Sequence, residues 1–564
     1  MAKETNHSRW IDPKSGFCPD TKIFHSLRPP VPLPPLSKPL SLTEYALSLL
    51  QSYASKETQA TTTALIDLSS GVHVSYSHLL RQIRSLALSL KSQFPFLSKD
   101  GGHRTTTTPT AFVLCPTSLH VPVVYFALMS LGVVVSPANP VGSDSDVTHQ
   151  VQLTRPAIAF ATSSTARKLP PSLPTILLDS PEFLSMLDRP DTGDLFEPVH
   201  QTDTAAILYS SGTTGRVKGV ALTHRNLIAI LTGYHELRLE PADPSVPEPH
   251  PVSLFFLPLF HVFGFFMLAR AVALGETLVL MERFDFEPML RAVEKYKVTY
   301  MPVSPPLVVA LVNSELARKY DLSSLRLLGC GGAPLGEETI KSFNAKYPNV
   351  EITQGYGLTE SAGSVTRMLG EEETKRYASV GRLAENMEAK IVDPDTSQPL
   401  PPGKRGELWL RGPLIMKGYV GDEKATAETL DSEGWLKTGD LCMFDSEGCL
   451  YIVDRLKELI KYKAYQVPPA ELEHLLHSHP DIVDAAVIPY PDEVAGQLPM
   501  AYVVRKPGSN LTEAQVMDFV AQKVAPYKKV RRVAFISAIP KSPAGKILRR
   551  ELVNHALSKG SSKL

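Results

Sequence analysis

The sequence is poor in cysteine and lacks any apolar run long enough to cross a bilayer comfortably. Its five cysteines form neither a CxxC pair nor a Cys/His metal pattern, which argues against a disulfide framework and against a zinc site. The most apolar stretch, residues 254–268, is interrupted by Pro258, His261 and Gly264. The amino terminus has no apolar core of a signal peptide. We therefore expect no membrane span and interpret residues 254–268 as the buried wall of a pocket.

The chain also lacks net charge, because 58 Lys and Arg residues balance 58 Asp and Glu residues. The charge is nevertheless uneven: residues 521–564 hold eleven basic residues and a single acidic one, Glu551. A basic tail either solvates a surface or meets an anionic small molecule. No basic pattern interleaved with aromatic residues is present, so we expect no nucleic-acid partner. The last three residues, Ser562, Lys563 and Leu564, match a peroxisomal address, which predicts an import receptor as partner and the peroxisome as location.

A chain of 564 residues is too long for one hydrophobic core, so several domains are expected. Strand and helix patterns alternate, which favours a mostly parallel sheet flanked by helices. Helices are expected at Leu42–Tyr53, Tyr76–Leu90 and Pro305–Tyr320, strands at Thr110–Leu114, Gly132–Ser136, Ala205–Tyr209, Lys297–Val303 and Leu325–Leu328, and polar loops at Ser55–Thr63 and Lys99–Thr108. Short strands with Gly and Pro turns over Met387–Val453 indicate a small β subdomain, and a domain boundary is expected after Asp454.

A segment rich in glycine and hydroxyl groups follows the apolar strand Ala205–Tyr209. It reads SSGTTGRVKG and contains Ser210, Ser211, Gly212, Thr213, Thr214, Gly215 and Lys218. Glycines let the backbone approach a ligand closely, while hydroxyl, N–H and cationic groups suit phosphate oxygens. The segment lacks the GxxxxGK[ST] pattern of P-loop ATPases. Because it stands between the strand and a helical pattern at Asn226–Thr232, we interpret it as a phosphate-binding loop rather than a flexible linker.

This segment resembles the phosphate-binding signature of the adenylate-forming enzymes, the superfamily of acyl-CoA synthetases, luciferases and peptide-synthetase adenylation domains. Four later motifs extend the resemblance along the chain. The later motifs follow in the family's order: residues 355–360 (GYGLTE) resemble the adenine and metal motif, 438–440 (TGD) the ribose motif, 454–458 (DRLKE) the hinge and 540–546 (PKSPAGK) the loop of the catalytic lysine. Residues 406–412 (GELWLRG) and 461–468 resemble the plant 4-coumarate–CoA ligase-like group, including its peroxisomal members.

The resemblance implies an α/β fold with a large N-terminal adenylation domain, residues 1–454, made of two doubly wound α/β subdomains and a small β subdomain. A small, mobile α+β domain, residues 455–564, would carry the catalytic lysine. The implied activity is that of an ATP-dependent carboxylic acid–CoA ligase, which forms an acyl-adenylate and then transfers the acyl group to coenzyme A. ATP, Mg²⁺ and coenzyme A are the implied cofactors.

The resemblance also assigns roles to individual residues. Adenylation brings a carboxylate towards the α-phosphate, and Lys546 is expected to neutralise the two anions. Glu360 is the expected Mg²⁺ ligand, in keeping with the preference of that ion for oxygen. Taken alone, Lys546 would be a solvated lysine, and Glu360 an acid favoured at a helix N-terminus. The other expected nucleotide contacts are Gln354, Gly355, Tyr356, Thr359, Asp440, Arg455 and Lys457.

The second half-reaction needs a site for coenzyme A, whose phosphates carry several negative charges. The basic tail can serve as a counter-surface together with Lys461 and Lys463, and the resemblance assigns Lys461 and Gln466 to the catalytic site. The sequence departs from the family at Ala464, where members commonly have glycine. If that glycine needs a positive φ, the added methyl group would slow or reshape thiolation.

The acid is the least determined part of the prediction. His261 needs a polar partner inside its apolar wall, and is either a hydrogen-bonded core histidine or, by resemblance, part of the acyl pocket. The resembled 4-coumarate ligases carry tyrosine where this chain has Phe263, so 4-coumarate is disfavoured. Small residues leave room for a longer or bulkier apolar acid: Gly264, Gly331 and Gly332, with Ala333 in the pocket wall. Fatty acids, cyclopentanone-type jasmonate precursors and cinnamate all stay open.

Three other activities compete with the ligase. A luciferase-like oxygenase shares all the motifs, as does a module that loads a carrier protein. Only a short segment follows Lys546, so a fused carrier domain is not expected. The complete set of Glu360, Asp440, Arg455 and Lys546 disfavours a non-catalytic nucleotide-binding protein.

Overall fold

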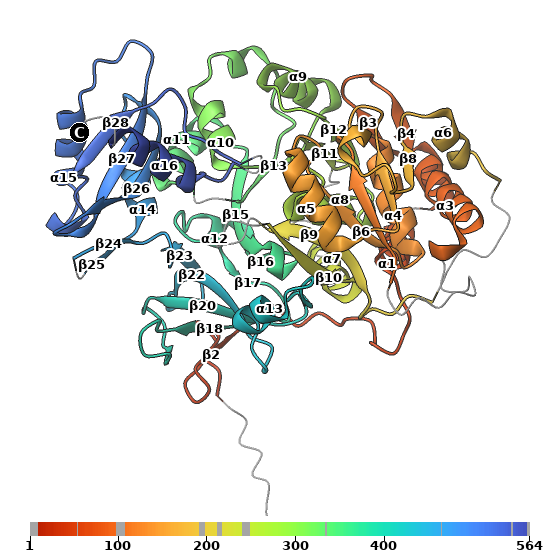
Figure 1. Cartoon of the computed structure of the whole chain (residues 1–564), viewed down its shortest axis with the longest axis horizontal. Helices are drawn as coiled ribbons and strands as arrows, with labels where there is room; N and C mark the ends of the chain where they lie inside the picture. Colours follow the sequence, from red (N-terminus) through yellow and green to blue (C-terminus); the bar gives the residue numbers. More distant parts are fainter. Residues whose placement is uncertain are drawn as a thin grey trace, which may run out of the picture.

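Two layered α/β units, a β subdomain and a C-terminal α+β domain make up the part of the chain that the structure describes (Figure 1). This computed structural model describes residues 10–53, 55–97, 108–190, 198–210, 217–239, 249–332, 335–463, 465–542 and 545–560. The predicted α/β class, with a large N-terminal and a small C-terminal domain, is confirmed.

The first mixed sheet has the strand order β21-β10-β9-β6-β5-β7-β8. Its parallel part comprises β5 (Thr110–Leu114), β6 (Val134–Pro137), β7 (Ile158–Ala161), β8 (Thr175–Leu177) and β9 (Thr204–Ser210). Two antiparallel strands, β10 (Lys218–Thr223) and β21 (Gly418–Tyr419), extend one edge.

Strand β10 was not foreseen. The helical pattern expected at Asn226–Thr232 lies within α7 (His224–Leu239), but Lys218–Thr223 first pairs antiparallel to β9. The residues between β9 and β10 therefore connect two antiparallel strands. This strand is mostly buried, with only Lys218 and Ala221 of intermediate exposure.

The second mixed sheet has the order β17-β16-β15-β14-β13-β11-β12-β3-β4. Its strands are β3 (Thr63–Asp67), β4 (His73–Ser75), β11 (Val252–Phe255), β12 (Thr277–Leu280), β13 (Tyr300–Val303), β14 (Leu327–Cys330), β15 (Glu351–Leu358), β16 (Gly363–Arg367) and β17 (Arg382–Leu383). The helix expected at Pro305–Tyr320 is shorter: α10 spans Pro305–Asn313, and a 3₁₀ turn follows at Leu316–Lys319. The Ser314 hydroxyl accepts the N–H groups of Leu316 and Ala317, which favours the start of a new turn over continuation of the helix.

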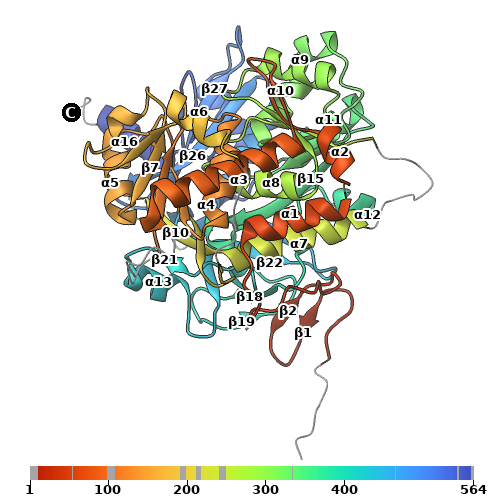
Figure 2. The same ribbon diagram turned by 90° about the vertical axis from the view of Figure 1, so that its right-hand side faces the viewer.

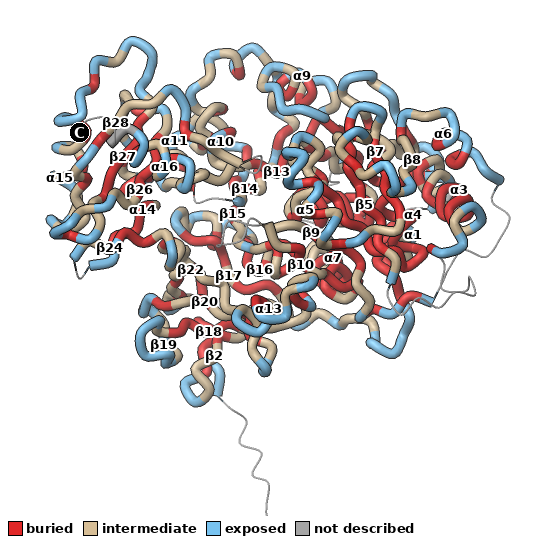
Figure 3. Tube along the Cα trace, in the orientation of Figure 1, coloured by how far each residue is buried: buried red, intermediate tan, exposed pale blue. Residues whose placement is uncertain are grey.

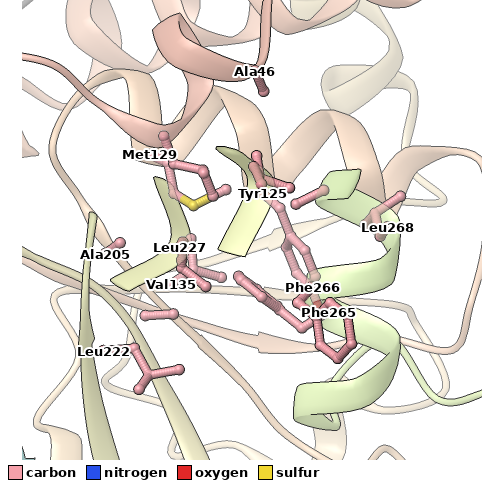
Figure 4. Packing of buried hydrophobic residues seen from close by; sticks show 14 of the residues in the cluster. Ala46, Tyr125, Met129, Val135, Ala205, Leu222, Leu227, Phe265, Phe266 and Leu268 are labelled. Carbon is pink, nitrogen blue, oxygen red and sulfur yellow. The ribbon is translucent and has the colours of Figure 1, made fainter. Parts of the chain in front are cut away.

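Helices fill the space between these two sheets. Helix α1 (Leu42–Tyr53), predicted with the same bounds, packs on α4 (His120–Ser130), α7 and α8 (Val262–Ala273), and α3 (Tyr76–Gln93) packs on α4 (Figure 2). Their apolar side chains meet those of the first sheet in one cluster, in which Phe265 and Phe266 of α8 lie near Tyr125 of α4 (Figure 4). No described helix is both long enough and apolar enough to traverse a bilayer.

The remaining helices of the large domain lie on the outer faces or in connections. They are α2 (Lys56–Thr61), α5 (Asp144–Thr154), α6 (Pro181–Leu187), α9 (Phe286–Tyr296), α11 (Glu337–Lys346), α12 (Gly370–Thr374) and α13 (Glu423–Thr429). Helix α2 occupies a segment expected to be a loop, because the Ser55 hydroxyl accepts the N–H of Thr58 and caps it.

The β subdomain is built from both ends of the large domain. Its sheet has the order β1-β2-β18-β20-β22-β23, with β19 paired to β18. The strands are β1 (Phe17–Cys18), β2 (Ile23–His25), β18 (Glu388–Val392), β19 (Pro399–Leu400), β20 (Gly406–Arg411), β22 (Leu436–Phe444) and β23 (Leu450–Arg455). The sequence analysis did not foresee β1 and β2, whose Phe24 stacks on Phe444 with ring centroids 4.5 Å apart.

The C-terminal domain has its own sheet, of order β25-β24-β27-β26 with β28 paired to β27. Its elements are β24 (Ile460–Tyr462), β25 (Tyr465–Val467), α14 (Pro469–His477), β26 (Ile482–Asp492), β27 (Gly496–Arg505), α15 (Glu513–Ala521), β28 (Arg532–Phe535) and α16 (Arg549–Gly560). Alternate residues of β26 and β27 belong to two separate buried clusters, one on each face of this sheet, and Figure 3 shows buried segments within this domain. The domain boundary at residue 454 stays a prediction.

Candidate active site

A cavity of about 790 Å³ opens at the carboxyl ends of parallel strands in the second sheet. Ser304 follows β13, Gly331 and Gly332 follow β14, and Tyr356 belongs to the end of β15; all four line it. This edge is where open α/β sheets bind ligands, because the loops that leave the strands converge there.

One described end of the glycine-rich segment contacts Glu360, and the other contacts Tyr419, which itself donates to Glu360. Ser210 ends β9, and its Oγ donates to Glu360 Oε1 at 2.9 Å. Lys218 is the register partner of Ser210 in β10, and its Nζ lies 4.5 Å from the ring centroid of Tyr419. The predicted phosphate contacts of Ser211, Gly212, Thr213, Thr214 and Gly215 lie outside the described residues.

Glu360 stands in a 3₁₀ turn, Thr359–Ser361, that directly follows β15. The hydroxyl of Tyr419 also donates to Glu360 Oε1, at 2.9 Å, so two donors fix the same carboxylate oxygen. No cluster of three or more His, Cys, Asp or Glu side chains arranged to hold a metal occurs among the described residues. A single carboxylate fits Mg²⁺, which commonly takes one or two protein carboxylates and completes its shell with water and substrate phosphates.

Asp440, Arg455 and Tyr356 form a second polar group. Asp440 faces Arg455 across the antiparallel pair β22–β23, with Oδ1 3.3 Å from Arg455 Nε. The Tyr356 hydroxyl donates to Asp440 Oδ2 at 2.5 Å. Burial raises the pKa of Asp440, while Arg455 and the Tyr356 hydroxyl act against this rise. Asp440 and Arg455, which are predicted to bind the ribose, are thus connected to Tyr356, which is predicted to contact the adenine.

The loop that carries Lys546 reaches the cavity from the C-terminal domain. The Ser542 N–H donates to Lys546 O at 2.8 Å, and Gly545 adopts a φ of 81°, which glycine enters without strain. A Cβ on Gly545 would lie 3.3 Å from Oγ of Ser304, which lines the cavity. The loop therefore docks on the cavity rim, where its positive φ favours glycine and a Cβ would make a tight contact with Ser304.

The charge of Lys546 acts on two neighbouring side chains, His261 and Asp440. Burial, and then the charge of Arg455, lower the pKa of Lys546 to about 8. Burial, and then the charge of Lys546, lower the pKa of His261. Asp440 is within the same electrostatic reach. Residues from the second sheet, the β subdomain and the C-terminal domain thus converge on one centre.

His261 has features of both interpretations that the sequence left open, a hydrogen-bonded histidine and a residue of the acyl pocket. Its Nδ1 accepts the N–H of Phe263 at 3.4 Å and caps α8, and its side chain lines the cavity. Phe263 also lines the cavity, with its Cε1 3.4 Å from where a Cβ on Gly331 would lie. The expectation that Gly264 makes room for the acid is wrong, because a Cβ there would lie 2.2 Å from Pro258 O. Gly264 lets the backbone pack, whereas Ala333 lies outside the described residues.

Several predicted residues are not at this centre. Lys461, Lys463 and Gln466 are exposed on the β24–β25 hairpin and are not among the cavity-lining residues, and Figure 1 shows these strands at the outer edge of the C-terminal domain. Lys457 is also exposed, but it lies within electrostatic reach of the centre, since its charge helps to lower the pKa of Lys546 and the charges of Asp440 and Glu360 act on its own pKa. Lys463 has a φ of 54°, and the neighbouring Ala464 lies outside the described residues.

Four other expectations concern Gly355, Thr359, Gln354 and the basic tail. Gly355 lines the cavity, and Thr359 is buried. The Gln354 side-chain amide donates to the carbonyls of Tyr377 at 2.7 Å and Ser379 at 3.2 Å, so its nucleotide contact stays a prediction. The basic tail is partly neutralised within its own domain, since Lys528, Lys541 and Arg549 pair with Glu471, Asp484 and Glu473 at 2.6 Å each.

The sequence analysis missed Tyr419 and Ser304. Tyr419 reaches Glu360 from β21, and Ser304 receives the lysine loop. Neither belongs to a motif, and each meets its partner only through sheet topology. For Ser304, its place directly after a parallel strand was the available signal.

Comparisons with known proteins give matches over most of the chain. A family model described as AMP-binding enzyme matches residues 53–420, and one described as AMP-binding enzyme C-terminal domain matches residues 471–546. The chain is 62% identical over 575 residues to 4-coumarate--CoA ligase-like 9 of Arabidopsis thaliana, covering 100% of both chains. It is 43% identical over 565 residues to peroxisomal OPC-8:0-CoA ligase 1 of the same plant, covering 97% and 99%.

A solved structure is similar in fold over nearly the whole chain. O-succinylbenzoate coenzyme A synthetase from Bacillus subtilis, in complex with ATP and magnesium ion, matches with a TM-score of 0.74 and 25% identity. The match covers 90% of this chain and 98% of that one.

Proposed function

We propose that this chain, which belongs to the AMP-binding enzyme family and to its plant 4-coumarate–CoA ligase-like group, converts an amphiphilic carboxylic acid into its CoA thioester through an enzyme-bound adenylate. The family supports an ATP-dependent acid–CoA ligase. The convergence of Lys546, Asp440 and Arg455 beside Tyr356 and His261, which line the cavity, carries the proposal.

In the first half-reaction, the acid carboxylate attacks the α-phosphate of ATP and pyrophosphate leaves. Lys546, held at the rim by Gly545, places its ammonium group between the two anions. Asp440 accepts from the ribose hydroxyls while Arg455 donates to them, and the Tyr356 ring lies against the adenine. Glu360, fixed by two hydroxyl donors, would hold Mg²⁺, which offsets phosphate charge when bound.

In the second half-reaction, the thiol of coenzyme A attacks the acyl carbonyl and AMP leaves. Lys461 and Gln466 are assigned to this step, and they lie on the exposed β24–β25 hairpin in the present arrangement. We therefore propose that the C-terminal domain turns about the segment between β23 and β24, which withdraws Lys546 and presents this hairpin.

The test is a panel of carboxylic acids, with AMP and CoA thioester measured together. We expect AMP and thioester in equal amounts with an aliphatic acid. AMP without thioester, accompanied by oxygen consumption, would instead indicate the luciferase-like alternative.

The pH dependence follows from Lys546. Because the pKa of this group is lowered to about 8, its charged fraction falls as pH rises through that value. We expect kcat/KM for acid-dependent ATP–pyrophosphate exchange to fall about tenfold per pH unit well above the pKa, since this parameter reports the free enzyme. In Lys546→Arg, whose guanidinium stays charged, the remaining activity should not show this decline. An unchanged alkaline limb in that variant would assign the titration to another group.

We propose that Phe263 helps to determine which acids the pocket prefers. Phe263→Tyr adds a hydroxyl group within the cavity, and we expect the kcat/KM ratio of 4-coumarate to cinnamate to rise roughly fivefold, the worth of about one hydrogen bond. Phe266→Tyr is the matched control, because Phe266 lines the same cavity and stacks on Phe263 with centroids 5.8 Å apart. An equal rise in the control would mean that position 263 has no special role.

The peroxisome is the proposed location, supported by the terminal Ser562, Lys563 and Leu564 and by the peroxisomal relative at 43% identity. These residues lie outside the described part of the chain. A fluorescent fusion that keeps the tripeptide terminal should enter peroxisomes, and removal of the tripeptide should leave it outside.

A further inference from the structure

The lysine loop brings a cation to a centre that already holds two others. Burial and the charges of Arg455 and Lys457 lower the pKa of Lys546, because like charges repel in a water-poor site. Asp440 acts in the opposite sense, but it is already paired with Arg455 at 3.3 Å and accepts the Tyr356 hydroxyl. The three cations therefore outnumber the carboxylate that lies among them.

Glu458 is the second carboxylate of this centre. It lies in the turn that follows β23, where its N–H donates to Arg455 O at 2.9 Å. Its side chain is 21% exposed, and its charge acts to raise the pKa of Lys546 and that of Lys457. The turn after β23 therefore places an acidic group close to both lysines.

Arg549, at the start of α16, holds this carboxylate in place. Its Nε donates to Glu458 Oε2 at 3.0 Å, while Nη1 and Nη2 donate to the two carboxylate oxygens of Glu473 at 2.6 and 2.9 Å. The Glu473 side chain is 7% exposed, and its Oε1 also accepts the N–H of Val487 at 2.7 Å. Because a guanidinium presents its donors in a planar fork, one arginine fixes two glutamates.

The charge of Glu458 is not consumed by Arg549. The bidentate pair with Glu473 already balances the one guanidinium with one carboxylate, so Glu458 brings a further negative charge to the group. Its Oε1 accepts no hydrogen bond within the described part of the chain. Arg549 therefore holds the position of Glu458 and leaves its charge to act on the neighbouring cations.

Arg549 also belongs to the segment that carries Lys546. It lies three residues after Lys546 in the chain, and the loop is closed at its base by the Leu548 N–H, which donates to Pro540 O at 2.9 Å. The arginine thus links the base of the lysine loop to the turn after β23. Since the linked residues all follow β23, the link turns together with the loop in the rotation proposed above.

We infer that Glu458 is a positioning residue for adenylation and that Arg549 holds it in place. The Glu458 carboxylate offsets the repulsion that the neighbouring cations exert on Lys546, so that the ammonium group can stay at the cavity. The inference rests on the proposed function and goes beyond it. Neither Glu458 nor Arg549 is among the residues that line the cavity, and both act through Lys546 rather than on the substrate.

The charge of Lys546 can be measured without turnover. Acetic anhydride reacts with the neutral amine, so the labelling rate of Lys546 at a series of pH values, read by mass spectrometry, gives its titration midpoint. Lys506, an exposed lysine of the same domain, is the internal reference. We expect Glu458→Gln to lower the midpoint from its parent value of about 8 by about one pH unit. An unchanged midpoint would overturn the inference.

The other charged and titratable groups that face Lys546 are the same in every variant: Arg455, Lys457, Asp440 and His261.

Two further variants separate charge from position. Glu458→Asp keeps a carboxylate on a shorter side chain and should recover about half of the shift. Arg549→Lys keeps the charge opposite Glu473 but loses the planar fork, so we expect the midpoint to fall by about half a pH unit. A parental midpoint in Arg549→Lys would contradict its role. Glu471→Gln is the control, because Glu471 pairs with Lys528 at 2.6 Å in the same domain, and an equal shift there would contradict the assignment to Glu458.

The kinetic consequence should be confined to the first half-reaction. In Glu458→Gln, acid-dependent ATP–pyrophosphate exchange should fall by less than about threefold near pH 6.5 and by about tenfold near pH 9, since less of Lys546 is charged at high pH. Thiolation of a supplied acyl-adenylate should fall by less than about threefold at both pH values. Equal losses in both half-reactions at every pH would indicate a purely structural role and overturn the inference. If the parent enzyme activates no acid, the proposed function fails, while the labelling midpoints still decide the inference.

Discussion

Lys546→Ala is expected to lose acid-dependent ATP–pyrophosphate exchange by about 10²- to 10³-fold, while thiolation of a supplied acyl-adenylate is largely spared. The reason is electrostatic: this side chain is the cation that the C-terminal domain brings beside Asp440 and His261. Removal of one preorganised charge from a water-poor site costs about this much in rate. Adenylation needs that charge, whereas thiolation starts after the anions have reacted.

The two half-reactions are measured separately, by isotope exchange and by thioester release from synthetic adenylate. Lys506→Ala is the control, since Lys506 is an exposed lysine of the same domain whose described hydrogen bonds are made by its backbone N–H and carbonyl groups. Equal losses in both half-reactions of Lys546→Ala would contradict the division of work between the lysine loop and the β24–β25 hairpin.

Glu360→Gln is expected to lower kcat/KM for MgATP by about 10²-fold and to raise the Mg²⁺ concentration needed for half-maximal exchange. The amide keeps the size of the side chain and an oxygen for Ser210 and Tyr419, but it loses the charge that attracts the ion. Exchange rates titrated with Mg²⁺ at fixed ATP give both quantities.

Tyr419→Phe separates the effect of the charge of Glu360 from the effect of its orientation. It retains the carboxylate of Glu360 and removes one of the two donors to Oε1, so we expect a loss of roughly tenfold or less. If Tyr419→Phe and Glu360→Gln had equal effects, the carboxylate would act as a structural acceptor and not as the metal ligand.

Some elements of the fold could be predicted from the sequence, and others could not. The bounds of α1 and β5 were predicted as they stand, because capping and apolar patterns are local. Strand β10 and the short strands β1 and β2 were missed. Each has a neighbouring partner, β9 for β10 and β1 with β2, but their sheets are completed by the distant strands β21 and β18. Gly264 was misread for a similar reason: sequence shows that a residue is small, but not whether backbone or ligand occupies the space beside it.

The sequence by itself determined the chemistry that is available: a phosphate-type loop, a metal-type glutamate, a ribose-type aspartate and a lysine on a glycine turn, in a fixed order. Tertiary structure decided which of these meet. It brought Gly545 of the lysine loop to Ser304 and Tyr419 to Glu360, and it left Lys461 and Gln466 exposed. The physical reason is that periodicity and turn chemistry act over a few residues, whereas proximity across a cavity is set by strand order and by the packing of distant segments.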